Sequence, residues 1–262
     1  MTASLAHNVE DNTAAFLLAL GRAGGGEERR DAGLHWTAGG SPIPYHNAVV
    51  RADLPPADTD QAIEAFTERL RGLGVPGSWH VGPSMRPVDL VERLEARGYE
   101  RSDEPGMAVD LGALVDAPAV AGLRVERVRT AERLGGFRQV LAAGFGEGEV
   151  EANWVCETYA RIGLGDGTAW RHYLGSVASE PVATASVYHT GDVAGLYFVC
   201  TAPGARRRGI GAAMTWHACR EAREVGARKA VLTASSMGRG VYERLGFREC
   251  CQIAVMELDP RP

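Results

Sequence analysis

The chain has 262 residues, 45% of them hydrophobic, and carries 28 basic against 33 acidic side chains, for a formal net charge of −5. That length leaves room for two modest domains, each with its own core. The acidic balance disfavours a nucleic-acid partner, because phosphate backbones require extended basic stripes. Five cysteines without metal-ligand spacing indicate reduced thiols, so we expect a cytoplasmic protein without a metal site.

The first predicted element is a helix over residues 13–20, whose apolar run is too short to span a bilayer. Glu10 and Asp11 precede it, where a secretion signal would carry basic residues. We therefore expect no membrane partner and no leader. The glycine-rich segment 21–26 does not join a strand to a helix, and it is interpreted as a flexible connector rather than a nucleotide-binding loop.

A domain boundary is expected within Gly112–Gly122, which is rich in glycine, alanine and proline. We accordingly divide the chain into domains of residues 1–117 and 118–262. In the second domain, residues 123–128 predict a first strand.

Two helices are predicted next. Thr130 is placed to cap a helix with Leu134, Phe137 and Leu141 on one face, and residues 154–159 indicate another helix. Turn-forming residues at Ser179–Pro181 and Thr190–Asp192 then divide residues 170–201 into three strands, which predicts a meander.

The turn from residue 200 to residue 212 carries the most specific chemical signal. It joins a predicted strand, Val193–Val199, to apolar residues that recur at helical spacing from Ile210 to Val225. Gly209 and Gly211 lack a Cβ, so an anion can approach the unpaired N–H groups of the first helical turn. The helix dipole contributes only about 0.3 to 2 kcal/mol. The adjacent arginines must supply much of the remaining attraction, and the turn therefore predicts a pyrophosphate site.

Arg206, Gly209 and Gly211 also satisfy the signature of the GCN5-related N-acetyltransferase (GNAT) superfamily, which is Arg or Gln, two residues, Gly, one residue, then Gly or Ala. A second match follows in the order that the family has. A strand is predicted at residues 230–233, and Tyr242, Gly246 and Phe247 then form a Tyr-x-x-x-Gly-Phe ending. The sequence thus resembles this superfamily from about Leu123 to Leu258, just over half of the chain.

The resemblance implies an α/β fold with a mixed sheet, that of the acyl-CoA N-acyltransferases. The first half lacks the glycine signature, but its end parallels the end of the second half. The matching residues are Ser84, Met85, Glu92–Leu94, Gly98–Tyr99 and Met107–Val109 with Ser236, Met237, Glu243–Leu245, Gly246–Phe247 and Ile253–Val255. We expect two GNAT-like lobes in tandem, the first degenerate and without a cofactor signature. Two unrelated endings that share common residues are the alternative.

Coenzyme A, as acetyl-CoA, is the cosubstrate that the resemblance implies. The phosphate-binding residues would be Arg206, Arg207, Arg208, Gly209, Ile210, Gly211 and Ala212. In the family, a strand bulge before this loop polarises the thioester carbonyl and contacts the pantetheine arm, and Val199 and Thr201 occupy those positions. Tyr242 matches the general acid that protonates the departing thiolate. A core aromatic residue with a satisfied hydroxyl is the alternative role for Tyr242.

Two departures from the family pattern concern the cofactor and the base. Ser235 stands where the family often has a cofactor-binding Asn, and it would reach the cofactor through water. The strand segment 196–199 carries no carboxylate to serve as the general base. By rough location the candidates are Glu147, Glu149, His172 and His189, each of which also suits a surface or packing role, and a water chain could serve instead.

The sequence analysis therefore predicts an N-acetyltransferase in which the amine of a small molecule attacks acetyl-CoA directly. Aromatic residues that would line the acceptor site, or equally the core, are Phe145, Trp154, Tyr159 and Trp170. A protein N-acetyltransferase and a non-catalytic coenzyme A-binding module are the alternatives. Lys229 is the only lysine among the 28 basic residues, which indicates a high-GC bacterial coding bias. The acyl chain length and the choice between monomer and homodimer stay open.

Overall fold

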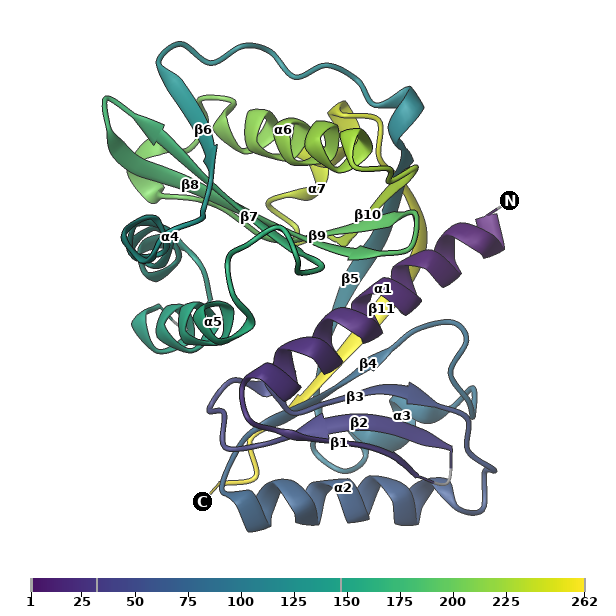
Figure 1. Ribbon diagram of the computed structural model, residues 1–262. Coiled ribbons are helices and arrows are strands. Elements are labelled where there is room, and N and C mark those ends of the chain that lie inside the picture. Colours follow the sequence, from purple (N-terminus) through teal and green to yellow (C-terminus); the bar gives the residue numbers. More distant parts are fainter. Residues whose placement is uncertain (1, 32, 147, 262) are drawn as a thin grey trace. The chain divides into compact units, whose positions relative to one another are not determined.

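The computed structural model describes residues 2–31, 33–146 and 148–261 (Figure 1). The chain divides into two units. Unit 1 comprises Met1–Gly106 and Cys250–Pro262, and unit 2 comprises Met107–Glu249. This division differs from the expected one at residue 117, because the C-terminal strand belongs to unit 1. Glycine and proline mark where the chain turns, whereas long-range strand pairing decides which unit a strand joins.

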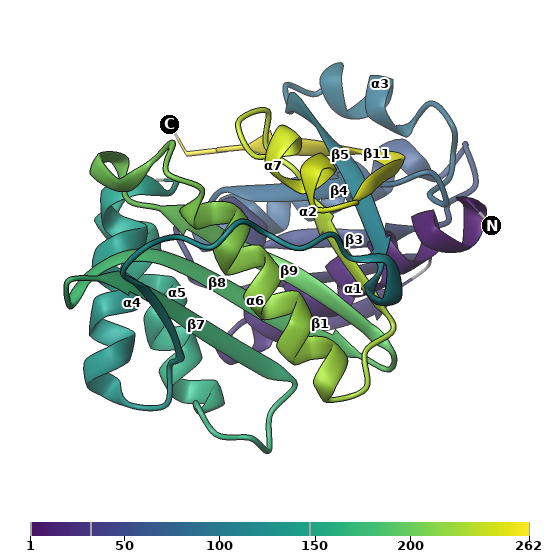
Figure 2. The same cartoon turned by 90° about the horizontal axis from the view of Figure 1, so that it is seen from above.

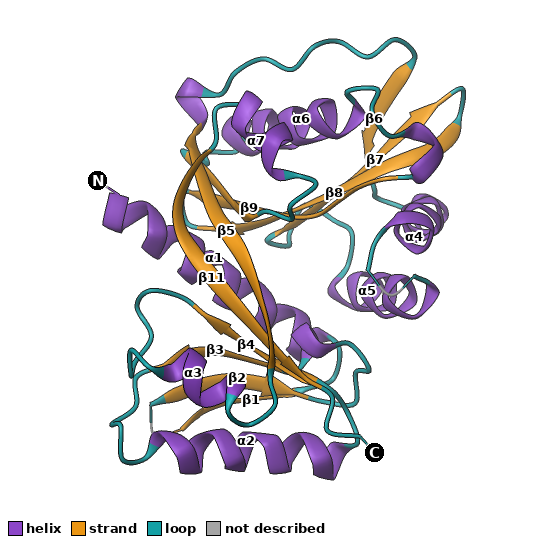
Figure 3. Cartoon of the chain, turned by 180° about the vertical axis from the view of Figure 1, so that it is seen from behind, coloured by secondary structure: helices purple, strands orange, loops and turns teal. Residues whose placement is uncertain are grey.

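Unit 1 is a mixed sheet with helices on both faces. Its elements are α1 (Thr2–Ala23), β1 (Glu27–Asp31), β2 (Leu34–Ala38), β3 (Ala48–Ala52), α2 (Thr59–Leu73), β4 (Gly77–Val81), α3 (Leu90–Glu95) and β11 (Arg248–Leu258). Strands β1, β2 and β3 form an antiparallel meander, β4 is parallel to β3, and β11 is antiparallel to β4. Helices α2 and α3 cover one face of this sheet and α1 covers the other (Figure 3).

The helix expected in the first half is longer than predicted, and a strand follows it. The helix predicted over residues 13–20 begins at Thr2 and continues to Ala23, so it includes part of the predicted connector. The charged run Glu27–Asp31 forms an edge strand. Its charges are compatible with a strand because an edge strand packs only partly, and charges there discourage pairing with other chains.

The strands of unit 2 lie in the order β5-β10-β9-β8-β7-β6 and include parallel and antiparallel pairs. The elements of this unit are the end of β5 (Glu100–Asp110), β6 (Leu123–Arg127), α4 (Ala131–Gly144), α5 (Glu149–Ile162), β7 (Trp170–Val177), β8 (Glu180–Thr190), β9 (Val193–Thr201), α6 (Ile210–Glu224), β10 (Lys229–Thr233) and α7 (Arg239–Arg244). Helices α4 and α5 cover one face, and α6 and α7 cover the other (Figures 1 and 3). The predicted meander and the Thr130 cap, which accepts from the Arg133 N–H at 3.3 Å, are confirmed.

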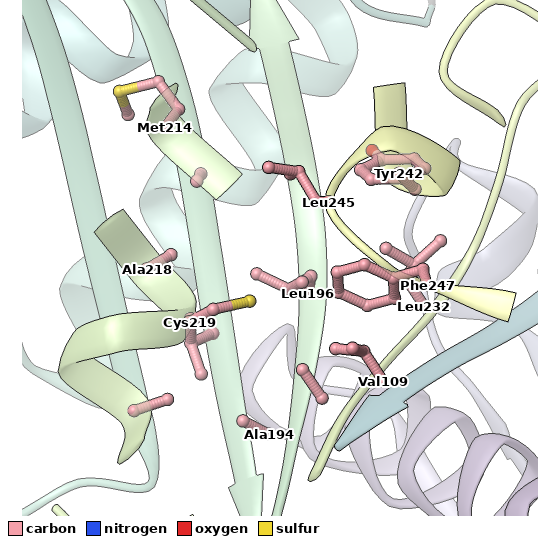
Figure 4. Close-up of a cluster of buried hydrophobic side chains, with 14 of the residues drawn as sticks. Val109, Ala194, Leu196, Met214, Ala218, Cys219, Leu232, Tyr242, Leu245 and Phe247 are labelled. Carbon is pink, nitrogen blue, oxygen red and sulfur yellow. The ribbon is translucent and has the colours of Figure 1, made fainter. Parts of the chain in front are cut away.

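The main core of unit 2 lies between its sheet and the helices α6 and α7 (Figure 4). It includes Met107, Val109 and Leu111 from β5 and the residues after it. Residues 112–122, expected as a linker, run along α6 (Figure 2) and pack Leu114, Ala117 and Val120 against this core. The segment is therefore an integral part of unit 2.

The two units repeat one order of elements: a three-stranded meander, a helix, a parallel strand, a short helix and a last strand. Gly98 and Gly246 occupy corresponding turns after the short helices, with φ of 83° and 96°. The predicted tandem fold is confirmed by this order. The last strands are exchanged, since β11 follows α7 in the chain but pairs with β4, while β5 follows α3 and neighbours β10.

Candidate functional site

The turn between β9 and α6 has the conformation of an anion-binding loop. Gly209 is the N-cap of α6, with φ of 80°, and Arg207 also has a positive φ of 64°. Backbone N–H groups converge in turns that alternate right- and left-handed residues, and they converge further where a helix begins. Glycine is favoured at position 209, because a left-handed conformation costs other residues roughly 1–2 kcal/mol.

The N-terminus of α6 is open. Its first backbone hydrogen bond joins the Ala213 N–H to the Gly209 carbonyl at 3.1 Å, so the N–H groups of the preceding helical residues have no acceptor within the helix. No side chain in the described part of the chain caps it. A Cβ at Gly211 would meet only Thr201 Oγ1, at 3.5 Å. Packing within the chain therefore does not require glycine at position 211, whereas close approach of an anion would.

The three arginines of the loop have different roles. Arg206 donates from Nε to the Thr201 carbonyl and from Nη2 to the Gly144 carbonyl, both at 3.0 Å. It therefore fastens the loop to the C-terminal end of α4, where a cation is favoured by the helix dipole. Arg207 and Arg208 are exposed, and their side chains have no partner within the described ranges. These two guanidinium groups are the ones open to an anion.

Strand β9 carries the bulge that the family resemblance implies. The β8–β9 register shifts between Thr184 and Ser186, and Phe198 on the opposite strand has a positive φ of 49°. The Thr184 hydroxyl donates to the Phe198 carbonyl at 2.8 Å and so holds the irregular backbone. A bulge leaves one residue outside the regular ladder. Val199 and Thr201 follow it, between the bulge and the α6 loop.

Tyr242 lies on α7 and points its ring into the core of unit 2, 5.9 Å from the Phe247 ring (Figure 4). It is 8% exposed. Its hydroxyl has no hydrogen-bond partner among the described residues, and burial raises its pKa above the ordinary value. The phenol is thus protonated at neutral pH, and the expected satisfied hydroxyl of a purely structural tyrosine is not observed.

Ser235 lies in the turn before α7. Its Oγ accepts a hydrogen bond from the Gly238 N–H at 3.2 Å, and the side chain is exposed. The hydroxyl hydrogen remains available, because only an oxygen lone pair is used in this contact. Ser235 therefore shapes the turn that leads to Tyr242 and can still donate outward.

The candidate bases differ in environment. Glu149 is exposed and paired with Arg138 at 2.7 Å. Burial, together with the smaller effect of nearby Arg127 and Arg171, lowers the pKa of His189 to about 4 and that of His172 to about 3. Both imidazoles are therefore neutral near pH 7. Glu147 lies outside the described residues.

A buried hydrogen-bonded chain beside the bulge was not foreseen. Tyr159 on α5 donates to Ser186 Oγ at 3.1 Å, and Ser186 Oγ lies 2.9 Å from His172 Nδ1. The Ser186 oxygen accepts from Tyr159 and also shares a hydrogen bond with Nδ1 of the neutral His172 ring, while His172 Nε2 is buried without a hydrogen-bond partner among the described residues. Tyr159 also contacts the Phe198 ring at 6.1 Å. The chain thus links α5, β8 and β7 to the bulge of β9.

The aromatic residues expected near the acceptor divide by burial. Tyr159 and Trp170 are buried, and their rings lie 5.3 Å apart. Phe145 and Trp154 are partly exposed. Phe145 contacts Phe198 with ring centroids 5.4 Å apart. The structure therefore brings three of the four residues into one aromatic cluster with the bulge.

The comparisons with known proteins agree with this architecture. The acetyltransferase (GNAT) family model matches residues 154–247. A GCN5-related N-acetyltransferase from Kribbella flavida is 22% identical, over 95% of each chain, with a TM-score of 0.76. A functionally unknown conserved protein from Staphylococcus epidermidis is 15% identical, over 89% of this chain and 94% of its own, with a TM-score of 0.71.

A tandem GNAT protein from the clavulanic acid biosynthesis pathway is 16% identical, over 87% of this chain and 79% of its own, with a TM-score of 0.61. At these identities the likenesses establish the fold. No curated protein has a significant sequence match. Across residues 2–31, 33–146 and 148–261, no three acidic, histidine or cysteine side chains are grouped to hold a metal ion. In the same ranges, no helix has the length and apolarity needed to cross a membrane.

Proposed function

Since residues 154–247 belong to the GNAT family, we propose that the protein transfers an acetyl group from acetyl-CoA to the amine of a small molecule. The observation that carries the proposal is the open N-terminus of α6. Arg207 and Arg208 stand beside it without partners in the described ranges, and Gly211 leaves its approach unobstructed.

In this proposal, the loop binds the pyrophosphate of the cosubstrate. The guanidinium groups of Arg207 and Arg208 pair with its charge, and the N–H groups from Gly209 to Ala212 donate to its oxygens. Arg206 keeps the loop in place through its two backbone acceptors. The arm of the cosubstrate then follows β9, where backbone groups around Val199 and Thr201 polarise the thioester carbonyl. Ser235 donates to the cosubstrate through water.

The reaction proceeds by direct attack. The neutral amine nitrogen forms a bond to the thioester carbonyl carbon, and the carbon–sulfur bond breaks as the tetrahedral intermediate collapses. The Tyr242 hydroxyl gives its proton to the departing thiolate, and the nitrogen loses a proton to solvent. Burial raises the pKa of Tyr242, which keeps the phenol protonated before the reaction but makes it a weaker acid toward the thiolate than an exposed tyrosine.

The acceptor would enter beside the aromatic cluster that includes Phe145 and Phe198. A net charge of −5 favours amines, which are cations before they lose a proton. No carboxylate lies on β9 near the bulge, and His172 is neutral and enclosed. Water is therefore the proposed route for deprotonation.

Binding is tested first, by titration calorimetry with acetyl-CoA. We expect one site per chain and a loss of at least tenfold in affinity, about 1.4 kcal/mol, in the double variant Arg207→Gln/Arg208→Gln. Arg220→Gln is the matched control, because Arg220 is exposed near the other end of α6. Unchanged affinity in the double variant would remove the loop from the proposed site.

Turnover is tested by thiol release from acetyl-CoA with a panel of small amines and peptides. Release that depends on a small amine supports the proposal. Release only with a peptide amino group would identify a protein N-acetyltransferase. Tight binding of acetyl-CoA without thiol release for any acceptor would favour a non-catalytic coenzyme A-binding module. The absence of a carboxylate on β9 is also compatible with that alternative.

A further inference from the structure

Unit 1 contains a cavity of about 330 Å³ between α2 and the strands β1 and β2, of which β1 is the edge strand. Figure 1 shows α2 running along this edge. The floor is apolar, with Leu34, Trp36 and Phe66 at most 9% exposed. Ala62 and Ala65 of α2 form a low wall, since their side chains are small. A volume of roughly 300 Å³ or more is typical of small-molecule sites.

In unit 2, an additional strand covers the sheet edge that corresponds to β1, and unit 1 has no such strand among the described residues. In unit 2, β6 pairs with β7, and Leu123 and Val125 of β6 pack against the core at that edge. In unit 1, among the described residues, no strand precedes β1, which forms the end of the sheet order. The apolar surface of Trp36 and Phe66 is thus left beside an open edge, where charged side chains of β1 and Arg69 of α2 line the cavity.

The charges at the rim have a definite order. Glu27, Arg29 and Asp31 alternate along β1 and all line the cavity. Arg69 of α2 reaches Glu27 at 2.5 Å and closes one end. Arg29 is held to Glu27 more loosely, at 3.4 Å. The Asp31 carboxylate has no partner within the described ranges. A guanidinium and a carboxylate therefore stand two residues apart, above an aromatic floor.

We propose that this cavity is a second small-molecule site, which binds a zwitterion with an apolar body, such as an α-amino acid with an aromatic or large aliphatic side chain. The carboxylate of the ligand pairs with Arg29, whose planar fork suits bidentate contact. Its ammonium pairs with Asp31, and its side chain lies on Trp36 and Phe66. The small volume restricts the body to about one ring. The site is independent of acetyl-CoA binding in unit 2.

Calorimetry with the full chain tests the charge pattern. The probes are L-phenylalanine, phenethylamine without the carboxylate, and 3-phenylpropanoate without the ammonium group. We expect L-phenylalanine to bind at one site per chain with a Kd below about 1 mM, and each analogue to bind at least about tenfold more weakly. Arg29→Gln should weaken binding of L-phenylalanine and 3-phenylpropanoate but not of phenethylamine. Asp31→Asn should weaken binding of L-phenylalanine and phenethylamine but not of 3-phenylpropanoate. Both residues are exposed, so folding is not at risk.

Ala65→Trp tests the position, because its indole would fill the cavity, and Gln61→Trp places the same side chain on an exposed position of α2 outside the lining. Binding should be lost only in Ala65→Trp. Equal binding in both variants, or no binding of any probe near 1 mM, would overturn the proposal. The proposal would also be overturned if the parent chain self-associates in sedimentation velocity and Ala65→Trp abolishes that association. The cavity would then be a contact between copies of this chain.

Discussion

Replacing Gly211 with Ala should stabilise the protein and weaken acetyl-CoA binding at the same time. The new Cβ would be 3.5 Å from Thr201 Oγ1, an ordinary contact, and Gly211 has no positive φ to conserve. Alanine is favoured over glycine in a helix by roughly 0.5–1 kcal/mol. For a chain of this size, that gain corresponds to a rise in Tm of about 1–4 °C.

The methyl group would meanwhile occupy the approach to the N–H groups of the first turn of α6. Loss of one charge-assisted hydrogen bond costs about 1.5–3 kcal/mol, so we expect acetyl-CoA to bind roughly 10- to 100-fold more weakly. Differential scanning calorimetry measures the first effect and titration calorimetry the second. An ordinary folding defect would lower both the Tm and the affinity for acetyl-CoA. A higher Tm together with a lower affinity therefore identifies a ligand-binding glycine.

Gly209→Ala is the matched contrast. Its φ of 80° penalises alanine by roughly 1–2 kcal/mol, so stability and binding should fall together. If Gly211→Ala binds acetyl-CoA as tightly as the parent protein, the N-terminus of α6 is not the pyrophosphate site. A lower Tm for Gly211→Ala would instead show that the space in front of this glycine is filled.

Tyr242→Phe removes only a hydroxyl, so acetyl-CoA affinity should change by less than about 1 kcal/mol while turnover falls roughly 10²- to 10⁴-fold; normal turnover in a chemistry-limited assay would show that the tyrosine is structural. Residues 107–249 contain β6 to β10 and the end of β5 that belongs to unit 2, whereas residues 118–262 lack the buried Met107 and Val109. We expect the first fragment to unfold cooperatively in circular dichroism and the second to be less stable, and the reverse ranking would contradict the exchange of last strands. The pKa of His172 is about 3 in the folded chain and 6.5 in the reference state, so the unfolded chain binds the extra proton and stability falls as pH decreases between these values. The loss is at most about 1.4 kcal/mol per pH unit. Urea unfolding near pH 7.5 and near pH 5 should show a smaller loss for His172→Phe than for the parent, and equal losses would exclude this contribution.

The loop between β9 and α6 could be located from the sequence because each of its signals is local. A run of apolar β-formers predicts the strand, glycines and a proline predict the turn, and apolar spacing predicts the helix. The observed bounds, Val193–Thr201 and Ile210–Glu224, follow that prediction closely. The sequence could not show that Arg206 has a different role from Arg207 and Arg208. Arg206 is distinguished by its hydrogen bond to the carbonyl of Gly144, which lies 62 residues earlier in the chain.

The buried hydrogen-bonded chain of Tyr159, Ser186 and His172 also could not be predicted from the sequence, because it depends on the register between β7 and β8. Counting outward from the pair Val177–Glu180 places His172 opposite Ala185. A shift between Gly175 and Ser176 moves its partner to Ser186 instead. One residue of register reverses the face on which a side chain lies. The hydrogen bond therefore depends on a bulge that no local pattern reveals.

The sequence by itself determined the two GNAT-like halves, the glycine-rich turn before α6 and the position of Tyr242, since these depend on residues close together in the chain. Only the tertiary structure decided that the last strands are exchanged, and that the segment 112–122 packs into unit 2. Residues 107–109 and 253–255 are similar enough to suit either sheet in a local pattern. Their places are set by the packing of whole strands against distant side chains, and that energy is not present in any short stretch of sequence.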